Sequence, residues 1–135
     1  MEGSREKGMA RQMAMPQEAK NLLARWYTQE QLESATLLQG SLIGWLFGMF
    51  GQAAVTVNKT VHLTPRAPDL GSTYGKVVLG HEYYHVLQQR EMGWWNFLAQ
   101  YVWLWRPYHV TQGWKHRLEA PAYARGEEVR AALES

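Results

Sequence analysis

The stretch that decides the fold covers residues 77–94 and reads VVLGHEYYHVLQQREMGW. Its apolar residues recur at helical spacing, so it predicts a buried helix over residues 76–92 that ends at Gly93. His81 and His85 are four positions apart, which places both imidazoles on one face of that helix. Two imidazoles on one face can hold a single metal ion.

Glu82 completes an HExxH pattern with these two histidines. On a helix it is turned too far to be a ligand, yet it reaches a water bound to the ion. Zinc lowers the pKa of such a water to about 7, and Glu82 can take its proton and later deliver it to a leaving amine. The alternative is a helix with two ordinary core histidines, but unpartnered imidazoles are costly in a buried segment.

A catalytic zinc ion usually takes three protein ligands and leaves one position open. The chain has no cysteine, so the third ligand must be His, Glu or Asp. The extension HExxHxxGxxH, which would add a third histidine, fails at Gln88 and Glu91. Glu119 is favoured because it lies among small residues in RLEAPAYA, which would let a helix approach the metal closely. The competing candidates are Glu127, Glu128, Glu134, His109 and His116.

The pieces GHEYYHVLQQREMGW and RLEAPAYA resemble the gluzincin metallopeptidases, where HExxH supplies two zinc ligands and a downstream glutamate supplies the third. More narrowly, they resemble the small bacterial minigluzincin domains, in which HExxH continues as His-Val-x-Gln-Gln, matched by residues 85–89. The resemblance covers about residues 54–125 and is strongest in the two quoted pieces.

This resemblance implies that His81, His85 and Glu119 bind one zinc ion per chain and that Glu82 is the general base. The nucleophile would be the zinc-bound water, and the reaction would be hydrolysis of a peptide or an unstructured protein. The likeness further implies a β-hairpin above the cleft, whose outer strand offers backbone groups to an extended peptide.

Two positions depart from the pattern of the larger gluzincins. Those enzymes often carry an acidic residue four positions after the ligand glutamate, to support a zinc histidine, and Tyr123 stands there in this chain. They also use a His or Tyr to stabilise the oxyanion. We favour Tyr108 for that role, and the alternatives are Tyr74, His109 and His116.

The rest of the chain predicts an α+β fold of zincin-like type, in which a β-hairpin or small antiparallel sheet packs on four to five helices around the HExxH helix. Residues 54–64 alternate apolar and polar around Asn58-Lys59, which indicates the hairpin and places His62 on its polar face as a surface residue. Residues 1–15 are expected to form a flexible tail, and residues 16–135 a single metallopeptidase domain. Further helices are expected from Pro16 and over residues 28–40, 94–105 and 114–133.

Residues 94–105, WWNFLAQYVWLW, are apolar on almost every side. We interpret them as a central core helix, packed against LIGWLFGMF at residues 42–50, because a helix that is apolar all round is usually buried. The alternative is contact with a membrane interface.

Composition narrows the class of protein. With 46% apolar residues the chain is not disordered, and a net charge of +2 without a basic run gives no groove for nucleic acid. The N-terminus lacks a secretory apolar region, and the longest apolar run is about half of the roughly 20 residues that a membrane span needs, so a cytoplasmic protein is expected.

The outer strand of the expected hairpin could also pair with a second copy of the chain. Two other functions compete with hydrolysis: a zinc-binding interaction module, and a membrane-surface or partner-binding protein.

Overall fold

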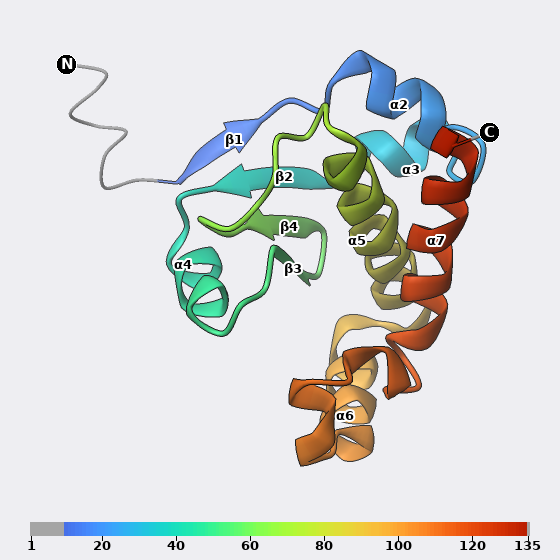
Figure 1. Cartoon of the computed structure of the whole chain (residues 1–135). Coiled ribbons are helices and arrows are strands. Elements are labelled where there is room, and N and C mark those ends of the chain that lie inside the picture. Colours follow the sequence, from blue (N-terminus) through green and yellow to red (C-terminus); the bar gives the residue numbers. More distant parts are fainter. Residues whose placement is uncertain (1–9, 135) are drawn as a thin grey trace, which may run out of the picture.

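A four-stranded mixed sheet and one long helix frame the molecule, which the computed structural model describes over residues 10–134 (Figure 1). The α+β class predicted from the sequence is confirmed. The elements are, in chain order, β1 Arg11–Met13, α2 Gln17–Leu23, α3 Gln29–Glu33, β2 Thr36–Gln39, α4 Leu42–Met49, β3 Ala54–Val57, β4 Thr60–Leu63, α5 Thr73–Met92, α6 Trp94–Leu104, the 3-10 turns η1 Pro107–Val110 and η2 Gly113–Lys115, and α7 Ala120–Glu134.

The predicted hairpin is present as the antiparallel pair β3 and β4. Asn58 in its turn has a φ of 57°, a left-handed conformation that asparagine tolerates better than most residues. The sheet is wider than the hairpin alone, because β2 runs parallel to β4 and β1 pairs antiparallel with β2. In the order β1-β2-β4-β3, strand β3 is an edge strand.

Strand β2 corrects the helix expected over residues 28–40. Thr28 does cap a helix, in a capping box with Gln31, but that helix ends at Glu33. Residues 36–39 instead pair with strands on both sides, and Leu37 is buried. Backbone pairing with distant strands outweighs the local helical spacing of the leucines.

The expected tail over residues 1–15 falls largely on residues 1–9, which lie outside the described part of the chain. Within its remainder, Arg11–Met13 form β1, which pairs with β2 at the edge of the sheet opposite β3. The sequence reading did not anticipate this strand.

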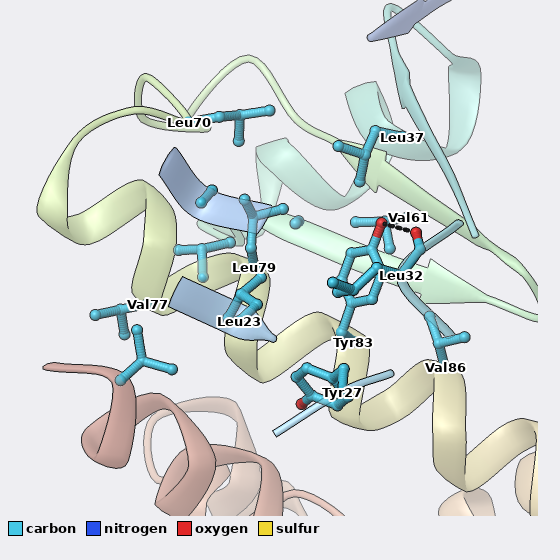
Figure 2. Close-up of a cluster of buried hydrophobic side chains, with 14 of the residues drawn as sticks. Leu23, Tyr27, Leu32, Leu37, Val61, Leu70, Val77, Leu79, Tyr83 and Val86 are labelled. Atoms are coloured by element: carbon cyan, nitrogen blue, oxygen red, sulfur yellow. Dashed lines mark hydrogen bonds between the residues drawn. The ribbon is translucent and has the colours of Figure 1, made fainter. Parts of the chain in front are cut away.

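The long helix α5 lies between the sheet and α7 in Figure 1. It begins at the cap residue Ser72, whose Oγ accepts a hydrogen bond from Gly75 N, and it ends at Gly93 with a φ of 84°, as predicted. Its buried face packs on the sheet and on the helices before it, and Leu79 is completely buried there (Figure 2). Burial of one such side chain contributes about 1.5–3 kcal/mol.

Two glycines let α7 approach α5 closely. A Cβ at Gly80 would lie 2.6 Å from Cγ2 of Val129, and a Cβ at Gly126 would lie 3.3 Å from Cγ1 of Val77. Helix α7 begins at Ala120, later than the expected residue 114, and Pro121 in its first turn suits a helix start. Because α7 packs closely on α5, Glu119, the residue before α7, lies beside the middle of α5.

The core position predicted for residues 94–105 is wrong. Helix α6 continues past the end of α5, and Phe97 is its buried residue, whereas Trp95 and Trp103 are exposed. The expected partner α4 is exposed as well, because its buried residues are Gly44 and Gly48. Within residues 10–134, no helix is both long and apolar enough to cross a membrane.

His62 is buried, which corrects its expected place on the surface. Strand β4 is an interior strand, and α4 contacts it, so both faces of this strand are covered. Nδ1 of His62 lies 2.8 Å from Oγ of Ser41, the cap residue of α4, and burial lowers the pKa of this histidine.

Candidate metal centre

The candidate metal centre lies where the middle of α5 meets the residue before α7. His81 and His85, one turn apart on α5, place their Nε2 atoms 3.1 and 2.8 Å from Oε1 of Glu119. One ligand atom from each residue lies within 4.8 Å of the others. Metal–ligand bonds of about 2.0–2.2 Å fit a cluster of this size, and two imidazoles with one carboxylate are a donor set of catalytic zinc sites. These three residues could therefore hold a metal ion.

The ring of His85 is oriented by Gln88, one turn further along α5. Nε2 of Gln88 donates to the carbonyl of Leu118 at 2.9 Å, which leaves its Oε1 to accept a hydrogen bond from Nδ1 of His85 at 2.8 Å. The hydrogen bond from Nδ1 orients the ring so that Nε2 faces Glu119. Histidines that bind metals usually have their other ring nitrogen hydrogen-bonded in this way. Gln88, the first of the two adjacent glutamines in the quoted motif, therefore orients a candidate ligand.

The charges of His85 and Glu119 are strongly coupled, because their side chains are in contact and largely shielded from solvent. Burial lowers the pKa of His85, but the carboxylate of Glu119 outweighs burial and raises that pKa to about 9. Burial likewise raises the pKa of Glu119, yet His85 and His81 together hold it well below its usual range. The carboxylate is thus ionised at neutral pH, and a divalent cation would replace the proton that Glu119 retains on His85.

Tyr101 of α6 holds the other oxygen of the ligand carboxylate. Its hydroxyl donates a hydrogen bond of 2.7 Å to Oε2 of Glu119, and burial followed by the charge of Glu119 raises the pKa of Tyr101, so that it stays a donor. Its ring stacks on His116 at 4.0 Å between centroids. His116 in turn donates from Nε2 to the Tyr101 carbonyl and accepts at Nδ1 from the backbone N–H of Leu118.

We expect Tyr101→Phe to weaken the binding of a metal ion at this cluster by about 10- to 100-fold, the usual effect of removing a hydrogen-bond partner of a metal ligand. The phenylalanine ring keeps the stacking on His116, so the fold should remain. Competition titration with a chromogenic chelator measures the dissociation constant. Tyr123→Phe is the matched control, since it keeps the ring that lies edge-on to His81 at 4.5 Å. Equal affinities of the two variants would contradict this role of the Tyr101 hydroxyl.

Glu82 lies beside the ligand cluster and is held by the edge strand. Its Oε1 accepts a hydrogen bond of 2.7 Å from Oγ1 of Thr56 in β3, and its Oε2 lies 3.9 Å from Nε2 of His81. Gln89 fastens the same strand to α5, because its Nε2 donates to the Thr56 carbonyl at 3.0 Å. No local pattern of the sequence connects Thr56 to Glu82, so this contact was not predicted.

A pocket of about 500 Å³ opens over this cluster. Glu82 and the three clustered residues lie in its lining, together with the whole edge strand β3 and the inward stripe of α6. Phe47 and Phe50, in and just after α4, line it as well. The aromatic and aliphatic residues of its wall are Phe47, Phe50, Val55, Val57, Trp94, Phe97, Leu98, Tyr101, Trp105, Val110 and Tyr123.

Of the four candidates for stabilising an oxyanion, only His109 is among the residues that line the pocket. Tyr108, which we favoured, is half exposed, and its ring lies against His109 at 4.4 Å between centroids, so the structure does not bring it to the ligand cluster. Nδ1 of His109 accepts from the backbone N–H of Arg106, and burial, His116 and Arg106 lower its pKa. A neutral His109 with Nδ1 engaged keeps its proton on Nε2.

The other candidates for the third ligand have other partners. Glu128 pairs with Arg125 at 2.8 Å, and Glu127 with Arg130 at 3.5 Å, both on α7. Neither these residues nor Glu134 belongs to the ligand cluster found in the described part of the chain.

The sequence model of the eCIS core domain matches residues 14–93. The match contains α2 to β4 and all of α5, including the HExxH segment, and it stops before α6 and the residue that completes the ligand cluster. Its description names a core domain and no class of peptidase. No curated protein and no solved structure matches the chain.

Proposed function

The chain belongs to the eCIS core domain family, and we propose that it hydrolyses peptide bonds with a zinc ion held by His81, His85 and Glu119. One observation carries this proposal: a His-His-Glu cluster with a fourth polar side chain, the carboxylate of Glu82, beside it on the wall of a pocket. The sequence resemblance to gluzincins agrees with this arrangement of residues.

We take the ion to be zinc because the two histidines belong to an HExxH pattern. Two histidines and one glutamate are the ligands of several zinc peptidases, and such sites leave a fourth position for water or substrate. When bound, zinc would lower the pKa of a water at that position to about 7 and would polarise the carbonyl of the scissile bond.

Glu82 supplies the acid–base chemistry in this proposal. Thr56 engages Oε1 of the carboxylate, and this leaves Oε2 to accept the proton of the attacking water. The same oxygen can then deliver the proton to the amine nitrogen as the peptide bond breaks. His109 lines the pocket, whereas Tyr108 does not, so His109 replaces Tyr108 as our candidate for hydrogen-bonding the carbonyl oxygen that becomes negative. Its ring also has a hydrogen bond to the Lys115 backbone, which substrate would have to replace.

The substrate is an extended peptide in this proposal. Strand β3 is an edge strand whose residues 54–57 all line the pocket. Gln89 already engages the Thr56 carbonyl, so an extended substrate would pair with the remaining outward-facing backbone groups of this strand. Segments whose backbone is already paired in a helix or sheet cannot pair with β3, and we therefore expect cleavage of unstructured chains.

Metal removal tests the proposal. Purified protein incubated with a peptide library should cleave peptides, dialysis against a chelator should abolish the cleavage, and about one equivalent of zinc should restore it. Magnesium at the same concentration is the control, because it prefers oxygen ligands and should not restore activity. Cleavage that persists in the metal-free protein would overturn the proposal.

A further inference from the structure

Large apolar side chains lie on the outside of α6 and on the turns that follow it. Trp95 and Trp103 are 76% and 79% exposed, and Val102, Tyr108 and Trp114 are at least half exposed. We call these five residues the aromatic surface. Burying exposed groups of this kind is strongly favourable, and an exposed apolar cluster marks a place of interaction.

The segment that carries the aromatic surface has charged residues of one sign. Between Glu91 and Glu119 the sequence contains no Asp or Glu, while Arg106, Lys115 and Arg117 are present and exposed. In Figure 1, α6 lies at the end of the molecule away from α2, α3 and the C-terminus. Those distant elements carry most of the described acidic residues: Glu18, Glu30, Glu33, Glu127, Glu128 and Glu134. The partner of the aromatic surface should therefore be anionic.

Helix α4 is a second exposed apolar element, and it lines the same pocket as α6. The sequence has no charged residue between Glu33 and Lys59. A Cβ at Gly44 would lie 2.7 Å from the Leu63 carbonyl oxygen, so α4 packs on β4 through its glycines and turns its large side chains, such as those of Leu42 and Trp45, outward. Side chains from α4 and α6 line the same pocket, so the two helices flank its mouth.

We propose that the aromatic surface and α4 dock on an anionic lipid bilayer. Tryptophan and tyrosine favour the bilayer interface, where one part of the ring is apolar and another is wet, and nearby Arg and Lys bind anionic headgroups. Lipid phosphates carry charge of one sign, which matches the exposed cations in this segment. Helix α6 has 11 residues and is therefore about 16 Å long, roughly half of the hydrocarbon thickness, so it lies in the interface.

Vesicle co-sedimentation of the zinc-loaded full chain tests this proposal. Vesicles of phosphatidylglycerol and phosphatidylcholine should bind the protein in a salt-sensitive manner, and vesicles of phosphatidylcholine alone should bind it much more weakly. Trp95→Ser with Trp103→Ser should weaken binding by at least about tenfold, and both side chains are exposed, so the fold should survive.

Charge reversal provides the matched comparison. Lys115→Glu with Arg117→Glu should weaken binding by about 25-fold, since each basic residue near an anionic surface contributes roughly fivefold. Arg25→Glu with Lys59→Glu makes the same change in net charge at exposed positions outside the surface and should bind nearly as the unaltered chain does. Retained zinc content shows that each variant is folded.

Three results would overturn the proposal. The first is equal binding to vesicles with and without phosphatidylglycerol. The second is equal loss of binding in the two charge-reversal variants, which would indicate a net-charge effect. The third is no vesicle binding together with a dimer that Trp95→Ser and Trp103→Ser dissociate, which would assign the aromatic surface to a second copy of the chain. None of these measurements depends on peptide hydrolysis.

Discussion

Glu82→Gln should lower the rate of peptide hydrolysis by about 10²- to 10⁴-fold, the usual contribution of general acid–base catalysis, while about one zinc ion per chain stays bound. The glutamine oxygen can still accept the hydrogen bond that Thr56 donates to Oε1, so the side chain keeps its place and loses only its ability to take a proton. Steady-state kinetics on a cleaved peptide, with elemental analysis of the same sample, measures both quantities.

Glu91→Gln is the control for this experiment, because Glu91 lies on the same helix, is exposed and is absent from the pocket lining. Unchanged hydrolysis by Glu82→Gln would show that another group or another protein performs the reaction. Loss of zinc from Glu82→Gln would show that Glu82 holds the metal site together. In that case the zinc-binding interaction module would become the better account of this chain.

His85→Ala and Glu119→Ala should each abolish stoichiometric zinc binding, because each leaves only two of the three ligands. We expect the zinc affinity to fall by more than the 10- to 100-fold that follows loss of a ligand's hydrogen-bond partner. Elemental analysis after gel filtration gives the stoichiometry, and chelator competition gives the dissociation constant.

Glu128→Ala is the control for these two variants, because Glu128 is exposed, pairs with Arg125 and lies on the helix that follows Glu119. Full zinc content in Glu119→Ala, with loss of zinc from Glu128→Ala, would reverse our choice of the third ligand. Circular dichroism should accompany the His85→Ala measurement, since this side chain is buried and its removal leaves a cavity.

Local patterns were sufficient for the features that depend on neighbours in the chain. Helix α5, its end at Gly93 and the common face of His81 and His85 follow from helical periodicity and from glycine's left-handed conformation. The turn at Asn58 followed equally from alternation and turn chemistry.

Local sequence patterns did not predict which apolar segments are buried. The sequences of α4 and α6 are those of core helices, but the space above the sheet and α5 is already filled by other elements. An apolar sequence reports that burial would be favourable, and it does not report whether a partner is present within the chain.

In the candidate metal centre, too, some residues were predictable from local sequence and others were placed by packing. Two of its three clustered residues, His81 and His85, come from a single helix, so their geometry is set by the 3.6-residue repeat and is visible in the letters of the chain. Glu119 reaches them because Gly80 and Gly126 let α7 pack closely on α5.

Tyr101 and Thr56 reach the site from α6 and β3, and their hydrogen bonds to Glu119 and Glu82 join residues 18 and 26 positions apart. No periodicity of a helix or strand extends over such separations. Contacts of this kind are produced by the packing of whole elements, so the residues that orient the ligand and the base became identifiable only from the folded chain.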